Sequence, residues 1–130
     1  MELIHIPMSP GELLDKITIL EIKSERMEDA EKLANVRTEL DLLNATWRDA
    51  VNADETVTRI HGELKAINEE LWEIEDDIRD KERVKEFDER FIELARAVYF
   101  TNDRRAAAKK ELNQYLGSTI VEEKSYQDSA

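Results

Sequence analysis

Residues 9–27 read SPGELLDKITILEIKSERM, and the interpretation of the whole chain starts from this stretch. Ser9 precedes Glu12 by three residues, which is the spacing of a capping box at a helix N-terminus. Pro10 falls at the first helical position, where its missing N–H costs no hydrogen bond. The pattern predicts a helix that begins at Pro10 and ends near residue 28.

This first predicted helix is apolar on two sides. At about 100° per residue, one broad face is made by Leu13, Leu14, Ile17, Leu20 and Met27. Ile19 and Ile22 lie nearly opposite that face. A surface helix has a single apolar stripe, so we expect this helix to lie centrally, with neighbours on both sides. Asp15 falls between Ile19 and Ile22, where a carboxylate needs a partner or a path to water.

Composition narrows the class of protein. The chain has 130 residues, 41% of them hydrophobic and 38% charged, with three Gly and two Pro, which favours long helices in one domain. The net charge of −12 and the lack of a Lys/Arg cluster argue against binding to nucleic acids or to anionic membranes. There is no cysteine, no apolar run of membrane-spanning length and no signal-peptide pattern. We therefore expect a cytoplasmic protein, and no motif indicates a cofactor.

The rest of the chain predicts an all-α fold, an antiparallel bundle of three to four long helices with coiled-coil-like seams. The expected segments of this single domain, residues 1–130, are an extended arm (1–8), helices at 10–28, 30–52, 54–80 and 86–116, and a tail (118–130). Asp29 and Asp54 are candidate N-caps. Gly117 is a natural stop for the last helix.

Two of the predicted helices carry heptad seams. The seam of the second helix consists of Leu33, Val36, Leu40, Leu43, Trp47 and Val51. The seam of the third helix consists of Val57, Ile60, Leu64, Ile67, Leu71, Ile74 and Ile78. Two such seams joined by a short turn predict that these helices pack against each other as an antiparallel hairpin.

The last helix and the tail leave more room for alternatives. No Gly or Pro lies between Phe87 and Leu116, so we predict one continuous helix. Residues 101–103 carry N-cap chemistry, and a break there is the alternative. In the tail, residues 119–121 are Thr, Ile and Val, which favour a strand that pairs with the arm at residues 1–8.

An acidic run lies in the predicted helix 54–80 and consists of Glu69, Glu70, Glu73, Glu75, Asp76, Asp77 and Asp80. Mg²⁺ is bound by carboxylates together with substrate phosphates, so a metal-binding face is one interpretation. The run is similar to half of the EExxE…ExxD signature of all-α nucleoside triphosphate pyrophosphohydrolases, but the second half is missing. We favour the other interpretation, a solvated charged face, and assign no metal ligands.

A polar cluster interrupts the apolar stripe of the last predicted helix. Asn102 and Arg105 fall inside that stripe, where an Arg must be paired, and Glu21 and Asp15 are the candidate partners. One interpretation is a pocket between the first and last helices, in which Lys16, Glu21, Asn102 and Arg105 bind a small anion or a nucleotide. The other interpretation is a buried ion pair that fixes the packing register.

A polar stripe on the third predicted helix lies opposite its heptad seam and consists of His61, Lys65, Asn68, Trp72, Asp76 and Arg79. Trp and Arg are common anchors of protein interfaces. His61, Lys65, Trp72 and Arg79 are therefore the candidate interaction surface. The alternative is that the last helix or the tail covers Trp72.

Five segments together resemble a bacterial family of small proteins of unknown function: SPGELLDKITILEIKSERM, KLANVRTEL, LKAINEELWEIEDDIRD, FIELARAVYFTNDRRAA and LGSTIVEEKSY. The resemblance runs from Ile6 to about Tyr126 and implies a bacterial or bacteriophage source, but no activity. The first two helices are also slightly similar to an all-α chorismate mutase, with Arg26 and Arg37 at two cationic positions. Ser9 stands where that enzyme has an early Arg, which argues against this activity.

Two hypotheses for function follow. The first is an acidic interaction or adaptor module that acts through contacts with a protein partner or as a homodimer, because the seams are coiled-coil-like and no catalytic motif is complete. The second is a small all-α enzyme or ligand-binding protein that uses the pocket between the first and last helices, with Mg²⁺ on the acidic face as an option. We favour the first hypothesis, and whether the protein is an enzyme stays open.

Overall fold

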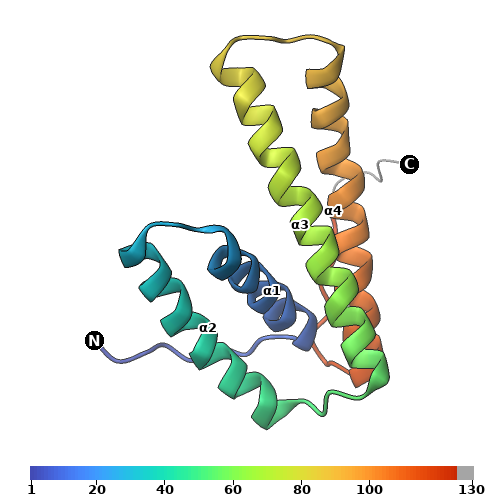
Figure 1. Ribbon diagram of the computed structural model, residues 1–130. Helices are drawn as coiled ribbons and strands as arrows, with labels where there is room; N and C mark the ends of the chain where they lie inside the picture. The colour runs from blue at the N-terminus through green and yellow to red at the C-terminus, as the bar shows by residue number, and fades with distance from the viewer. Residues whose placement is uncertain (126–130) are drawn as a thin grey trace.

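Four helices make up the protein, as the computed structural model, which describes residues 1–125, shows in Figure 1. The helices are α1 (Pro10–Arg26), α2 (Ala30–Ala50), α3 (Glu55–Arg83) and α4 (Glu89–Leu116). The predicted all-α fold is confirmed. α3 runs three residues further than expected, and α4 begins three residues later, at a cap supplied by Asp88.

The helix ends follow from local side-chain chemistry. The Glu12 N–H donates to Ser9 Oγ at 3.2 Å, which confirms the predicted cap of α1. Asp29 and Asp54 accept from backbone N–H groups at the start of α2 and α3, each at 2.9 Å, so these two predicted caps are also confirmed. Gly117 ends α4 with a φ of 70°, a left-handed conformation that favours glycine.

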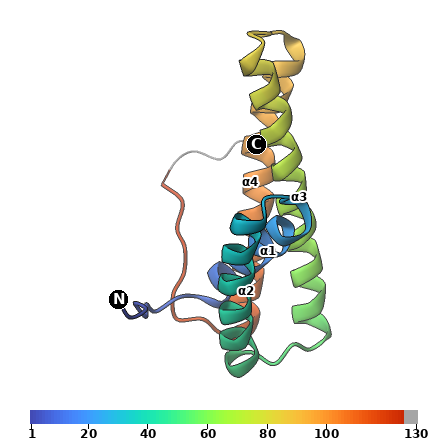
Figure 2. The same cartoon turned by 60° about the vertical axis from the view of Figure 1, so that its left-hand side comes forward.

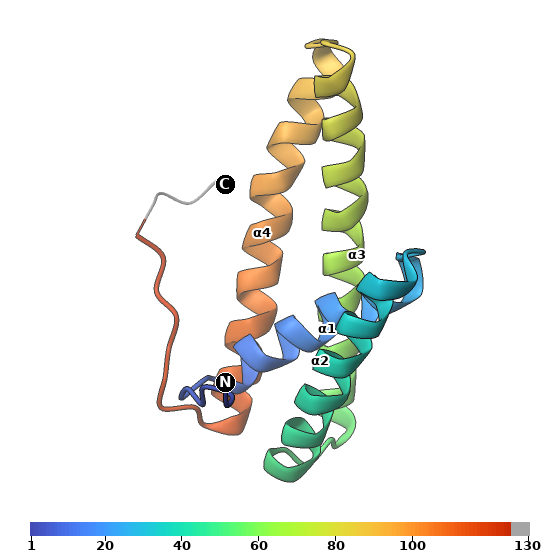
Figure 3. The same ribbon diagram turned by 90° about the vertical axis from the view of Figure 1, so that its left-hand side faces the viewer.

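α1 lies at the centre of the fold and runs beside all three other helices. Its side chains Leu14, Ile17 and Ile22 are at most 1% exposed. Figure 3 shows α1 between α2 on one side and the α3–α4 pair on the other. The two-sided apolar pattern of this helix therefore predicted its place correctly, because both sides are covered.

The predicted hairpin of the second and third helices is wrong. The backbone of α2 runs beside α1 alone, whereas α3 runs beside α1 and pairs over its length with α4. A heptad seam shows that a helix needs a partner but does not say which one. Here α1 comes between α2 and the other two helices, and α4 supplies a long apolar face for α3. Continuity of α4 through residues 101–103 is confirmed.

The α3–α4 hairpin extends well past α1 and α2 (Figure 1). We call its far part, residues 74–100, the outer hairpin. In the turn between its two helices Lys85 has a φ of 59°, and Phe87 packs edge-on against Phe91 with ring centroids 5.2 Å apart. No third helix covers this part of the hairpin in Figures 1 and 3.

The two ends of the chain are extended and unpaired. Residues 1–125 contain no strand, so the predicted pairing of the arm with the tail is wrong for this part of the chain. A two-stranded ribbon without a covering layer has little stability, which explains the difference. Figure 2 shows the tail leaving the end of α4 and turning back along that helix. The rest of the predicted tail, residues 126–130, lies outside the described residues. Within residues 1–125, no helix is long and apolar enough to cross a membrane.

Candidate binding groove and its polar network

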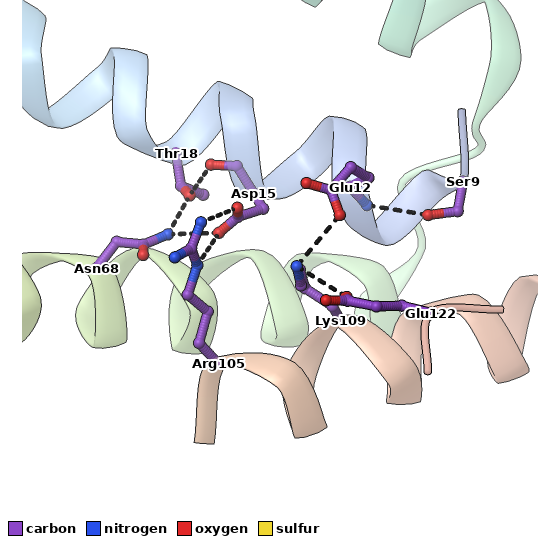
Figure 4. A network of polar contacts seen from close by, with 8 residues as sticks. All are labelled: Ser9, Glu12, Asp15, Thr18, Asn68, Arg105, Lys109 and Glu122. Atoms are coloured by element: carbon purple, nitrogen blue, oxygen red, sulfur yellow. Dashed lines mark hydrogen bonds and ion pairs between the residues drawn. The ribbon is translucent and has the colours of Figure 1, made fainter. Parts of the chain in front are cut away.

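Asp15 of α1 is the centre of a buried polar network drawn in Figure 4. Its side chain is 3% exposed, and its Oδ1 accepts from Arg105 Nε of α4 at 2.8 Å. Arg105 Nη2 donates to the other carboxylate oxygen, so the contact is bidentate. This hydrogen-bonded partner raises the pKa of Arg105 above its ordinary value, and the guanidinium stays charged.

Asn68 of α3 completes the network around Asp15. Its Nδ2 donates to Asp15 Oδ1 and to Thr18 Oγ1, both at 2.9 Å. Thr18 in turn donates to the backbone oxygen of Asp15 at 2.7 Å. The buried carboxylate therefore has donors from two neighbouring helices, which is the condition under which a charge is tolerated in a core.

Lys109 forms a second polar contact one turn further along α4. Its side chain is 9% exposed, and its Nζ lies 3.1 Å from Glu12 of α1 and 2.9 Å from Glu122 of the tail (Figure 4). Burial lowers the pKa of Lys109, but the hydrogen bonds to Glu122 and Glu12 outweigh burial, and the net effect raises this pKa. Lys109 thus connects the tail to the start of the central helix.

Gly11 allows α1 to approach α4 closely. Its N–H donates to Asn113 Oδ1 at 2.7 Å. A Cβ at Gly11 would lie 2.6 Å from the backbone oxygen of Lys109, which is shorter than side-chain atoms approach. The close crossing of α1 and α4, and with it the position of Asp15 opposite Arg105, depends on this glycine.

Beside the network, a groove of about 450 Å³ opens where α1 crosses the α3–α4 hairpin. Its lining comes from three helices and consists of Ile19, Ile22, Asn68, Leu71, Trp72, Glu75, Asp76, Arg79, Asn102 and Arg105. The groove combines four apolar side chains with six polar or charged ones, so it offers both apolar walls and hydrogen-bonding groups to a ligand. It is the candidate functional site.

The structure brings together half of the residues that the sequence suggested. Asn102 and Arg105 from the predicted pocket share the groove with Trp72 and Arg79 from the predicted interaction surface. Lys16 does not join them, because it pairs with Glu39 of α2 at 3.3 Å.

The other predicted residues lie along the contact between α1 and α3. Of the two candidate partners for Arg105, Asp15 forms the contact, whereas Glu21 Oε1 lies 2.8 Å from His61 Nε2. Lys65 is 2.8 Å from Glu25 of α1. His61 and Lys65, at the start of the stripe on α3, therefore contact α1, and the rest of the stripe, from Asn68 to Arg79, lines the groove.

Trp72 is half-buried, and Arg26 of α1 lies over its ring. The guanidinium of Arg26 lies 5.9 Å from the centre of the Trp72 rings, a cation–π contact. The same Arg26 is 3.5 Å from Glu73. Arg26 and Arg37 are the two positions compared above with the cationic residues of a chorismate mutase. Arg26 makes these contacts at the edge of the groove, whereas Arg37 lies on α2, outside the groove.

Several residues of the polar network could not be found from the sequence. The sequence placed Asn68 in the polar stripe but did not identify it as a hydrogen-bond donor to Asp15. Its partners lie 50 or more positions away, so no local pattern indicates the contact. Lys109 and Asn113 flank Leu112 on the buried face of α4, and this pair of polar residues beside a core leucine was the available signal.

The acidic run on α3 is largely neutralised by arginines. Glu70 is 2.6 Å from Arg104, and Arg79 is 3.0 Å from Glu75. In the part of the chain that the structure describes, no group of three His, Asp or Glu side chains is placed to hold a metal ion. The acidic face thus offers no ready ligand set for Mg²⁺.

A second hollow, of about 670 Å³, lies between the outward face of α4 and the tail. Ala106 and Ala107 lie on its α4 side and Val121 on its tail side. The tail is held there by the contact of Glu122 with Lys109 and by a hydrogen bond from Lys124 to Asp103.

The fold and the groove define a small all-α protein with a polar network under an open binding groove. The chain belongs to the Family of unknown function (DUF6165), whose model matches residues 4–130. This match agrees with the expected membership in a family of unknown function. Neither a curated protein nor a solved structure matches the chain.

Proposed function

We propose that the protein is an interaction or adaptor module that docks a positively charged amphipathic helix of a protein partner on its outer hairpin. The observation that carries this proposal is the uncovered apolar surface at the far end of α3 and α4. Two helices alone cannot bury all of their apolar side chains. A further helix that covers the exposed ones removes their apolar surface from water, which stabilises the complex.

The apolar surface follows one face of α4. Ile92 and Tyr99 lie seven positions apart, so they share a face of the helix, and they are 55% and 59% exposed. Phe100, next to Tyr99 in sequence, and Val84 and Phe87 in the turn of the same hairpin are also exposed. An amphipathic helix that docks with its apolar face contacts apolar side chains at such spacings.

Charge decides which kind of partner fits. Four of the six cations of the outer hairpin are paired within it: Arg79 with Glu75, Lys81 with Glu86 and Asp88, Arg83 with Asp80, and Arg90 with Glu93. The other two, Lys85 and Arg96, form no ion pair among residues 1–125 and are outnumbered by the unpaired acids. Among residues 1–125, Asp76, Asp77, Glu82 and Glu89 form no ion pair. The unneutralised charge is therefore negative and favours a partner that carries Lys or Arg.

A designed helical peptide with a leucine face and lysine flanks tests the proposal, with a peptide of the same length that carries glutamate flanks as its counterpart. We expect the lysine peptide to bind and the glutamate peptide to fail in a titration followed by ¹H–¹⁵N spectra. Ile92→Glu should weaken binding at least about tenfold, which corresponds to about 1.4 kcal/mol. Leu42→Glu is the matched control, because Leu42 is an exposed apolar residue on α2, away from the hairpin.

Equal binding of the two peptides, or equal effects of Ile92→Glu and Leu42→Glu, would contradict the proposal. A homodimer through the same surface is the second arrangement, supported by the expectation that two hairpins complete a four-helix bundle. Light scattering over a range of protein concentrations distinguishes the two. A dimer that Ile92→Glu dissociates would assign the surface to a second copy, and a monomer at all concentrations leaves it for a different partner.

A further inference from the structure

Two amide side chains in the groove, those of Asn68 and Asn102, have hydrogen-bonding atoms without a partner among residues 1–125. Asn68 is 5% exposed, and because its Nδ2 must donate to Asp15 and Thr18, its Oδ1 faces away from them as an acceptor. Within residues 1–125 no group donates to that oxygen, and the half-buried Asn102 makes no side-chain hydrogen bond at all. Polar atoms at such positions normally have a partner, and a ligand in the groove is a partner that the Asn68 oxygen and the Asn102 amide are both free to take.

The Asn68 oxygen must reach the groove. Every fully buried side-chain nitrogen or oxygen in the described part of the chain has a hydrogen-bond partner. An unpartnered oxygen on a residue that is 5% exposed therefore touches open space, and the open space that Asn68 lines is the groove.

Two further donors are free at the same place. Arg105 uses Nε and Nη2 for Asp15, and its Nη1 donates to no group within residues 1–125. The indole N–H of Trp72 is also without a hydrogen-bond acceptor in this range. The groove thus offers an amide, an amide oxygen and two N–H donors between apolar walls.

From these groups we infer that the groove binds a flat, uncharged nitrogen heterocycle of the nucleobase class. An asparagine amide presents a donor and an acceptor side by side, which matches the donor–acceptor edge of such a ring. The oxygen of Asn68 accepts from a ring N–H or an amino group. Ile19, Ile22 and Leu71 supply apolar walls. Trp72 adds an aromatic side chain to the lining, the kind of side chain against which bases stack.

The charges around the groove explain why the ring rather than a phosphate is recognised. Arg105 is neutralised by Asp15, and Arg79 is paired with Glu75 at 3.0 Å. Asp76, which forms no ion pair within residues 1–125, adds a negative charge to the rim. A phosphate would find no unpaired cation there, so the anion-binding role considered for Arg105 is disfavoured.

Titration of the protein with adenosine, guanosine, cytidine and uridine, followed by ¹H–¹⁵N spectra, tests the inference. We expect at least one nucleoside to give saturable shifts of the Trp72 indole and the Asn102 amide signals. Adenosine monophosphate should bind no more tightly than adenosine. Asn102→Ala should weaken binding at least about tenfold, whereas Asn35→Ala, the same change at an exposed site on α2, should leave it unchanged.

Three results would overturn the inference: no saturable shift with any nucleoside at millimolar concentration, a preference of more than tenfold for the phosphorylated compound, or equal binding by Asn102→Ala. Loss of folding does not confuse the test, since Asn102 makes no side-chain hydrogen bond in residues 1–125 and a melting curve verifies the variant. The inference does not depend on the proposed partner of the outer hairpin, because no partner is present in the assay.

Discussion

Arg105 binds both carboxylate oxygens of Asp15 across 90 positions of sequence, and this contact joins the central helix to the last one. The pair is enclosed by Asn68 and Thr18, so neither charge is left to water alone. It sits directly beneath the groove, whose rim Arg105 also forms. The same contact therefore stabilises the packing of α1 on α4 and positions the polar groups of the candidate site.

Replacing Arg105 with alanine should lower the free energy of unfolding by about 3 kcal/mol, because it leaves a buried carboxylate without its cation. We place the effect at the lower end of the range for such pairs, since the Arg105 side chain is 29% exposed. Urea unfolding followed by circular dichroism measures it.

The adjacent Arg104→Ala is the matched control. Arg104 pairs with Glu70 at 2.6 Å, but the two side chains are 55% and 48% exposed, so its loss should cost less than about 1 kcal/mol. In the double variant Asp15→Asn with Arg105→Ala, the loss should be smaller than the sum of the single losses. Additive losses, or equal effects of Arg104 and Arg105, would show that the buried pair is not coupled.

Two alanine substitutions at glycine should have opposite signs. Gly11→Ala places a Cβ 2.6 Å from the backbone oxygen of Lys109, so α1 must move away from α4, and we expect a loss of at least about 1–3 kcal/mol. Gly62→Ala lies inside α3 with nothing within 4 Å of its Cβ, and we expect a gain of about 0.5–1 kcal/mol.

Thermal unfolding of both variants checks the pair. Because the same atom is added in each case, a destabilised Gly62→Ala or a neutral Gly11→Ala would mean that the crossing of α1 and α4 is looser than the structure shows. A change in the Asn113 side-chain amide signals should accompany the Gly11 variant alone, since Gly11 donates to that side chain.

Local features of this fold could be predicted from the sequence, whereas the pairing of the helices could not. Ser9, Asp29 and Asp54 act within three residues of themselves, so their caps follow from spacing alone. The two-sided pattern around Ile17 and Ile22 placed α1 centrally for a similar reason, because it is a property of one helix.

Pairing depends on geometry that no single segment contains. The seam through Trp47 and the seam through Leu64 have the same spacing, and nothing in either shows that α1 lies between the two helices. Likewise Arg105 was expected to need a carboxylate, but Asp15 and Glu21 were equally available. Only the crossing position, which Gly11 permits, assigns Asp15 to Arg105 and leaves Glu21 to His61.

Lys109 should make the stability of the protein sensitive to alkaline pH. Burial lowers its pKa, the hydrogen bonds to Glu122 and Glu12 raise it, and the net pKa in the folded state lies above the ordinary 10.5. A raised pKa means that the stabilising contribution is complete below pH 10.5 and is lost as the pH rises through the folded-state value. The difference in unfolding free energy between the native sequence and Lys109→Met should therefore shrink above pH 10.5.

Lys110→Met provides the comparison for this measurement. Lys110 is exposed and forms no ion pair within residues 1–125, so its replacement should shift stability by the same small amount at every pH. Urea unfolding at several values between neutral and alkaline pH gives both curves. A constant difference for Lys109→Met would contradict the proposed role of its charge.

α2 should be the first helix to open. Its backbone runs beside α1 alone, and only Val36 and Trp47 on it are buried. A helix with one neighbour and few buried side chains has a low free energy of local opening, so its amides should exchange with solvent faster than those of α1. Native-state hydrogen exchange measured peptide by peptide tests this order.

Trp47→Ala should enlarge the difference between α2 and the rest of the protein. Trp47 is 7% exposed and joins α2 to the core around Leu14 and Leu64, so its truncation should cost about 3 kcal/mol, with the largest rise in exchange on α2. Trp72→Ala, at a half-covered tryptophan outside that core, should cost less and leave exchange on α2 unchanged. If both variants accelerate exchange equally in all four helices, the protein opens as one unit and α2 has no separate opening step.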